Sequence, residues 1–271
     1  MVSVLIAAAA VAAASPQAMP AAPADDPALF VVRDTDTTVY IFGTFHALDG
    51  RSEWFNDDVR NAFERSGELV LETLVPEGPA KPAPAFTAAT APPLGALRVT
   101  PSASFLTTTR MAISAGRSQG MQVDNGADMV LRHVAEAEGK PVEGLETLES
   151  QLNMFNRMPA TAPSAAPRAG DPVDDPKAMQ SLSKAMTDMQ SAWKRGDQSV
   201  FVRMLEQLNR ASPDTYRVMF TERNGRWADW IAGRMQTPGT VFVAVGAGHL
   251  AGHDSLLVRL AQLGIESARV N

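Results

Sequence analysis

Cysteine is absent from the 271 residues of this sequence. Its absence excludes a thiol nucleophile, a metal centre with cysteine ligands and a framework of disulfide bonds. It leaves the cellular compartment open, because proteins without disulfides occur in reducing and oxidising compartments alike. A metal site in this chain would have to be built from histidine and carboxylate ligands.

Basic residues are also too few and too scattered to form a patch. The chain has 24 Lys and Arg against 30 Asp and Glu, which gives a formal net charge of −6. No basic cluster is present that would neutralise phosphates or hold an anionic membrane surface. We therefore expect no nucleic acid among its partners.

Long hydrophobic runs are missing as well. Residues 1–15 form an apolar stretch that is too short and too rich in alanine to span a membrane, and no later run is longer. Small residues follow it, so we expect residues 1–25 to be a secretory signal and Ala/Pro leader, although no basic residue precedes it. The exported chain would begin between Ala14 and Asp25 and reside in the periplasm or cell envelope. The alternative, a buried alanine-rich helix, is disfavoured by the prolines from Pro16 onward.

The remaining residues, 26–271, have the composition of an ordinary globular protein, with 45% hydrophobic and 20% charged residues in the whole chain. We expect them to form a single domain. Two stretches, near 76–101 and 159–172, are loaded with proline and alanine and are expected to be loops.

The pattern along this domain alternates between strands and helices. Residues 30–32 and 38–42 have strand character, residues 55–63 have apolar side chains at helical spacing, and residues 69–71 are again strand-like. A strand-helix-strand unit places its two strands parallel in one sheet, so we expect 69–71 to lie beside 38–42. Further helices are expected around 128–138, over 148–155, from Asp175, from Ser212-Pro213 and over 256–263, with strands at 240–245 and 265–270. The fold class is therefore α/β, with a mixed, largely parallel sheet flanked by helices.

Two of the four histidines follow the same pattern. His46 and His249 each stand three residues after a glycine that ends an apolar strand, in Gly43-Thr-Phe-His46 and Gly246-Ala-Gly-His249. In α/β sheets, ligands bind beyond the carboxyl ends of the strands, where a glycine lets the backbone turn sharply. We expect the two imidazoles to lie within about 10 Å of each other, as a metal site or an acid-base pair. The alternative is that each histidine bonds within its own turn.

Two glutamates occupy comparable positions. Glu72 directly follows the strand at 69–71, where a carboxylate can ligate a metal or activate water. Glu146 follows Gly144-Leu145 and is a second candidate. The alternatives are that Glu72 caps a helix or is solvated, and that Glu146 caps the helix that follows it.

Arg223 falls on the apolar stripe of its helix. The stripe is defined by four aromatic residues at helical spacing: Tyr216, Phe220, Trp227 and Trp230. A buried arginine needs an anionic partner, which would be Glu72, Glu146 or a substrate. The alternative is an arginine at the edge of the stripe that extends to water.

The other two histidines carry less weight. His249 and His253 have the spacing of a helical metal pair, but Gly252 lies between them and Leu250 occupies the position where a zincin helix carries glutamate. His133 lies on a helix with charged neighbours. We assign neither His133 nor His253 to the site.

The chain resembles the TraB/PrgY/GumN family, most closely in its bacterial GumN-like branch, and this family looks related to the TIKI metalloproteases. The matching pieces run in the family's order: residues 40–46, 69–72, 139–147 with Gln151, 222–224 with Trp227, and 245–250 with Gly252. The resemblance implies a fold akin to the ChaN and erythromycin-esterase group. It also implies a site of His46, His249 and Glu72, with Glu146 and Arg223 beside it. Residues 76–110 and 159–172 depart from the family's pattern, which puts the segment that selects the substrate in doubt.

Two functional hypotheses follow. The first is a metal-dependent, peptidase-like hydrolase in which His46, His249 and Glu72 hold a zinc, manganese or cobalt ion and Glu72 is ligand or general base. Its substrate would be a peptide or another small molecule. The second is a non-catalytic envelope protein that binds a small ligand, a peptide or haem in the same pocket. Retention of metal together with cleavage that a chelator abolishes would distinguish the first from the second.

Overall fold

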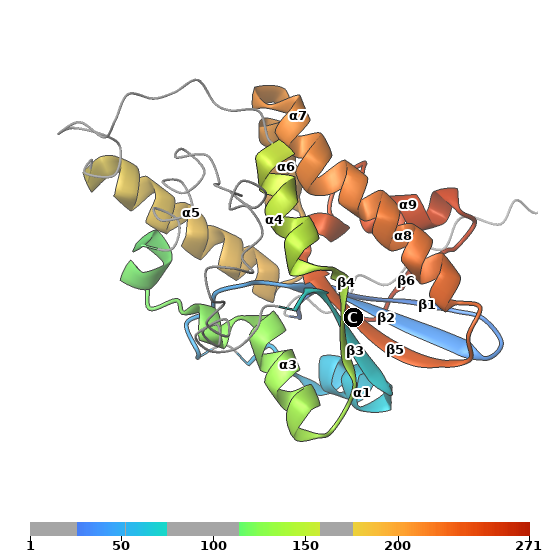
Figure 1. Ribbon diagram of the computed structural model, residues 1–271. Coiled ribbons are helices and arrows are strands. Elements are labelled where there is room, and N and C mark those ends of the chain that lie inside the picture. The colour runs from blue at the N-terminus through green and yellow to red at the C-terminus, as the bar shows by residue number, and fades with distance from the viewer. Residues whose placement is uncertain (1–25, 52, 75–113, 158–175) are drawn as a thin grey trace, which may run out of the picture.

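The computed structural model describes residues 26–51, 53–74, 114–157 and 176–271, and its centre is a six-stranded sheet with helices on both faces (Figure 1). The order across the sheet is β4-β3-β5-β2-β1-β6. The first four of these run parallel, β1 is antiparallel to β2, and β6 is antiparallel to β1. The strands are β1 (Leu29–Arg33), β2 (Thr37–Thr44), β3 (Glu68–Thr73), β4 (Val142–Glu146), β5 (Gly239–Gly246) and β6 (Ala268–Arg269). This arrangement confirms the predicted α/β class and its largely parallel sheet.

Most of the predicted helices are present. The helix expected from Ser212-Pro213 is interrupted by a π-helical turn, η3 (Arg217–Thr221), and the helix α6 was not predicted. The helices are α1 (Asp57–Arg65), α3 (Ala127–Ala137), α4 (Leu148–Arg157), α5 (Pro176–Lys194), α6 (Ser199–Ala211), α7 (Pro213–Tyr216), α8 (Glu222–Arg234) and α9 (Leu256–Gln262), with 3-10 turns η1 (Val123–Asn125) and η4 (Ala247–Leu250).

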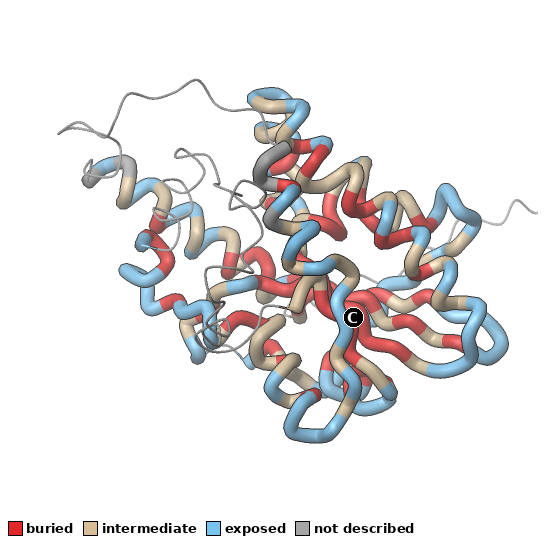
Figure 2. Tube along the Cα trace, viewed as in Figure 1, coloured by how far each residue is buried: buried red, intermediate tan, exposed pale blue. Residues whose placement is uncertain are grey.

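The two faces of the sheet carry separate apolar cores, and both are visible as buried stretches of the chain in Figure 2. Phe42 and Phe242 lie on one face with α1, α3, α5 and α6, where Trp193 is the largest of the fully buried side chains. Ile41 and Val243 lie on the other face, which α8 and α9 cover. Successive residues of a strand point to opposite faces, so strands buried on both sides read as continuous apolar runs.

The position of β5 corrects one expectation. We expected β3 to lie beside β2, but β5 pairs with both and separates them. All five residues at 241–245 are buried, as is typical of a central strand. A local strand-helix-strand pattern predicts that its strands are parallel and cannot show that a strand from the far end of the chain inserts between them.

Several sequence-based expectations concern other parts of the chain. The leader at 1–25 and the loops near 76–101 and 159–172 lie outside the described residues. Of the helices in the described part, none combines the length and apolar character that crossing a membrane requires. The closing strand expected at 265–270 is present only as the two residues of β6.

Candidate functional site

Four of the five candidate residues come from four neighbouring parallel strands, at the carboxyl end of each. Glu146 is the last residue of β4, Glu72 is next to the last of β3, and His249 lies in η4 directly after β5. His46 follows the end of β2 by two residues. Because these strands are adjacent in the order β4-β3-β5-β2, one edge of the sheet gathers all four side chains.

Gly246 marks the point on which three of these side chains converge. A Cβ on Gly246 would lie 3.1 Å from Glu72 Oε1, 3.2 Å from His46 Nε2 and 3.8 Å from His249 Cδ2. The imidazoles are therefore well within the separation of about 10 Å expected for a shared site. These distances confirm the expected proximity of His46 and His249. Because position 246 is glycine, the space between the three side chains is not filled by a side chain of its own.

Glu72 is held as a carboxylate at the centre of this group. Its Oε1 accepts from the backbone N–H of Gly246 at 2.6 Å and its Oε2 from Arg223 Nη2 at 2.8 Å. Burial raises the pKa of Glu72, but the imidazole of His249 where it is protonated in acid, the guanidinium of Arg223 and the imidazole of His46 lower it more, to about 2. Glu72 is thus ionised at neutral pH.

Arg223 joins the two carboxylates. Its side chain is 5% exposed, its Nε donates to Glu146 Oε2 at 3.0 Å, and its Nη2 donates to Glu72. Its Nη1 donates to His249 Nε2 at 3.2 Å. The guanidinium stacks on Trp227, with its carbon 4.5 Å from the ring centre. Glu72 and Glu146 are both partners, and the alternative of a side chain that extends to water is wrong.

His249 is buried, and each edge of its ring has a partner. Its Nδ1 lies 2.6 Å from Asn224 Oδ1, and the ring packs between Phe220 and Trp227, with centroids 4.8 and 4.4 Å away. Burial is the main reason that the pKa of His249 is lowered to about 3. The attraction of Glu72 raises the pKa by less than burial and the positive charge of Arg223 together lower it. This imidazole is neutral at physiological pH.

His46 has the opposite environment. Its side chain is 59% exposed, and its Nδ1 lies 3.2 Å from Asp128 Oδ1. Desolvation lowers the pKa of His46, but the hydrogen bond with Asp128 and the negative charges of Asp128 and Glu72 raise it to about 9. Water screens part of this attraction at so exposed a side chain. Because the Nδ1 atoms of His46 and His249 face residues of other elements, the alternative of histidines bonded within their own turns is wrong.

The donor set suits a divalent ion. Ligand bonds near 2 Å allow two donor atoms of one ion to be up to about 4 Å apart, and His249 Nε2 and Glu72 Oε1 are 3.8 Å apart. Metal-binding histidines typically have the other ring nitrogen tied by a polar partner, as both Nδ1 atoms are here. Among the described residues, no three His, Asp or Glu side chains are already arranged around one ion position. Completing the set requires the exposed His46 to turn toward Glu72 and Arg223 Nη1 to leave His249.

Buried polar atoms without a hydrogen-bond partner mark the same edge. In the described part of the chain there are four, and three of them are Thr44 Oγ1, Thr73 Oγ1 and Trp227 Nε1. Thr44 and Thr73 are the last residues of β2 and β3, and Trp227 touches His249. Buried hydroxyl and N–H groups are normally satisfied, so these atoms are the ones that a ligand or water would satisfy.

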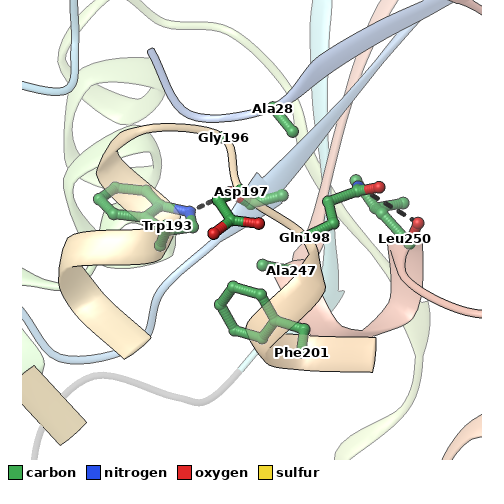
Figure 3. Close-up of a pocket in the computed structure, with 9 residues that line it drawn as sticks. Ala28, Trp193, Gly196, Asp197, Gln198, Phe201, Ala247 and Leu250 are labelled. Carbon is green, nitrogen blue, oxygen red and sulfur yellow. Dashed lines mark hydrogen bonds between the residues drawn. The ribbon is translucent and has the colours of Figure 1, made fainter. Parts of the chain in front are cut away.

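The turn at Gly43 is held by a hydrogen bond from α5. Trp193 Nε1 donates to the carbonyl oxygen of Gly43 at 2.7 Å (Figure 3). The cavity next to it, lined among others by Phe201, Ala247 and Leu250, has a volume of about 10 Å³, which holds about one water molecule. It is therefore too small to be a substrate pocket.

Comparison with known families agrees with the resemblance found in the sequence. The family model described as TraB/PrgY/gumN matches residues 28–89 and 85–269. The chain belongs to the TraB/PrgY/gumN family. No curated protein and no solved structure matches it. Membership of the TraB/PrgY/gumN family was expected from the ordered motifs, and the matched residues include all five candidate site residues.

Sequence reasoning missed the residues that support the site. Asp128 stands in the first turn of α3, where an acidic residue is also favoured by the helix dipole. Asn224 belongs to a motif that carried the family resemblance, but no role was assigned to it. His253, which was not assigned to the site, has a side chain that is 66% exposed and pairs with Asp254.

Proposed function

We propose that this protein is an exported metal-dependent hydrolase that acts on a peptide or amide bond, with His46, His249 and Glu72 as its metal ligands. The observation that carries the proposal is the convergence of both histidines and Glu72 on Gly246, while Asp128 and Asn224 tie the outer nitrogens of the two rings. The leader that supports export lies outside the described residues.

Glu72 suits the role of ligand better than that of general base. An efficient base has a pKa near the working pH, whereas the pKa of Glu72 is held at about 2. A carboxylate that is always ionised binds a cation without first losing a proton. A divalent ion bound here would supply Lewis acidity, activating water and polarising the scissile carbonyl group.

In this proposal, Arg223 and Glu146 hold the metal ligands in position. The guanidinium donates hydrogen bonds to Glu72, Glu146 and His249, so few of its N–H groups are left to bind a substrate oxygen. Its function in the proposal is to hold Glu72 beside His249 at the end of β5. Glu146 anchors the guanidinium from the side of β4.

His46 is the exposed member, and the proposal requires it to give up a proton. A protonated imidazole cannot ligate a metal, so metal binding at His46 would release a proton and be weaker at low pH. Asp128 would then hold the neutral ring through Nδ1–H, in the arrangement common for metal-bound histidines.

The test is elemental analysis of the purified protein for zinc, manganese and cobalt, followed by peptide cleavage assays with and without a chelator. We expect stoichiometric metal in the parent protein, its loss in His46→Gln and His249→Gln, and its retention in His253→Gln, the matched control outside the site. Cleavage should disappear with the chelator and return with metal. Equal metal contents in the parent and His249→Gln would contradict the proposal.

A parent protein that retains metal at this site but cleaves nothing would support the second hypothesis. The same group of residues would then bind a small ligand, a peptide or haem in a non-catalytic envelope protein. No contact in the described residues favours a particular ligand of this kind, so the hydrolase remains our proposal.

A further inference from the structure

Both ring nitrogens of His249 are in hydrogen-bond contact with neighbouring residues of one helix. Arg223 and Asn224 are consecutive in α8. Arg223 Nη1 reaches Nε2 of the ring at 3.2 Å, and Asn224 Oδ1 reaches Nδ1 at 2.6 Å. Asn224 is 1% exposed, so no solvent competes for this contact.

The orientation of the Asn224 amide is fixed by a second contact. Its Nδ2 donates to the backbone carbonyl oxygen of Asp254 at 2.8 Å, and a carbonyl oxygen can only accept. The amide oxygen must therefore face His249. Asp254 is itself held by Thr221, whose hydroxyl donates to its carboxylate at 3.1 Å, and by Arg259.

The protonation of the ring follows from these two contacts. An amide oxygen only accepts, so the hydrogen bond at Nδ1 requires a proton on Nδ1. A guanidinium only donates, so the contact at Nε2 requires a lone pair on Nε2. Both edges of the ring independently select the same tautomer, with the proton on Nδ1.

We propose that Asn224 is a positioning residue that fixes His249 as its Nδ1–H tautomer and so keeps the lone pair of Nε2 directed at Glu72 and Arg223. As a statement about metal affinity, the inference rests on the proposed function. When Nε2 ligates a metal, Arg223 Nη1 has to leave it. Asn224 is then the residue in the described part of the chain that still determines the tautomer.

The first test does not depend on metal or activity. In ¹⁵N-labelled, metal-free protein, two-bond ¹H–¹⁵N correlation spectra report which nitrogen of each imidazole is protonated. His249 is assigned by the signals missing from His249→Gln. We expect a protonated Nδ1, an unprotonated Nε2 and a slowly exchanging Hδ1 resonance shifted downfield by the short hydrogen bond.

Variants of α8 then identify the cause. Asn224→Leu has the same branched shape and number of side-chain heavy atoms but no acceptor, so the downfield Hδ1 resonance should disappear. Asn224→Asp keeps an acceptor oxygen and should retain it. Thr221→Val is the matched control, because it removes a different hydrogen bond to Asp254, from the last residue of η3 directly before α8. It should leave the resonance unchanged.

The second test measures metal affinity. Asn224→Leu should weaken zinc binding by about 10- to 100-fold, the usual effect of losing a polar partner behind a metal ligand, while Asn224→Asp stays near the parent value. A proton found on Nε2 in the parent, or a resonance unchanged in Asn224→Leu, would overturn the inference. A parent with the expected tautomer that binds no metal would instead refute the proposed function and leave the role of Asn224 intact.

Discussion

Arg223 and Arg226 form a natural pair for testing what holds the site together. Both lie on α8, both bind Glu146, and the contacts are 3.0 and 2.8 Å long. The side chain of Arg223 is 5% exposed and that of Arg226 is 51% exposed. Only Arg223 also binds Glu72. The same substitution at the two positions therefore compares the stability contributed by a buried arginine between two glutamates with that contributed by a half-exposed ion pair.

The expected costs differ clearly. Arg223→Gln leaves Glu72 buried without its arginine and leaves Glu146 with only the half-exposed Arg226. Breaking a buried pair in this way costs about 3–5 kcal/mol of unfolding free energy. Arg226→Gln removes a half-exposed partner while Glu146 keeps Arg223, so its cost should be about 0.2–1 kcal/mol. The difference is a large part of the total stability of an ordinary domain, about 5–15 kcal/mol.

The assay is equilibrium urea unfolding at pH 7, followed by circular dichroism and tryptophan fluorescence. Trp227 is a local reporter, because the guanidinium of Arg223 stacks on its ring. Arg223→Lys, which keeps the charge and loses the planar fork, should fall between the two variants and serves if Arg223→Gln does not fold. Equal destabilisation by Arg223→Gln and Arg226→Gln would refute the reasoning.

Three further predictions concern the surroundings of this network. Gly246→Ala places a Cβ 3.1 Å from Glu72 Oε1 and should reduce metal affinity at least about tenfold. In Gly225→Ala, on α8, the new Cβ has no atom within 4 Å, so this variant should raise the unfolding free energy by about 0.5–1 kcal/mol. The pKa of Glu72 is lowered from 4.5 to about 2, so its contribution of about 3 kcal/mol is complete above pH 4.5 and lost as the pH falls toward 2. Unfolding free energies measured against pH should show a shallower acid limb in Glu72→Gln. Trp193→Phe removes the donor to the Gly43 carbonyl oxygen and should cost about 1–3 kcal/mol in urea unfolding.

The sequence predicted five of the six strands and most of the helices because their signals are local. It did not predict β4, whose residues VEGLE lack a buried apolar run. The apolar run that became β5 is buried at every position from 241 to 245, and strands of this kind can be recognised without knowing their neighbours. The order of the strands is a non-local property. Nothing near β2 or β3 indicates that β5 pairs with both of them, and for that reason the expected adjacency of β2 and β3 was wrong.

For the candidate site, too, the sequence predicted which residues gather and did not predict all of their contacts. The Gly-x-x-His motif identifies residues at strand ends, and parallel strands bring those ends to one edge, so the proximity of His46, His249 and Glu72 could be anticipated. The partner of Arg223 could be narrowed to Glu72, Glu146 or a substrate because a buried guanidinium requires a counter-charge. Their simultaneous use by Arg223 depends on how α8 crosses the ends of β3 and β4, which sequence spacing does not determine.

The two Gly-x-x-His motifs show why repetition of a motif does not mean repetition of a role. Each motif fixes only where an imidazole leaves its strand. The group that meets Nδ1 comes from a different helix in each case, a carboxylate of α3 at His46 and an amide of α8 at His249. A carboxylate attracts a second proton onto the ring of His46, whereas burial and the neighbouring guanidinium of Arg223 oppose a second proton on His249, so His46 favours the cationic form and His249 the neutral one. Any reaction at this edge would therefore begin with two unlike histidines: a buried one whose lone pair already points inward, and an exposed one that must first lose a proton.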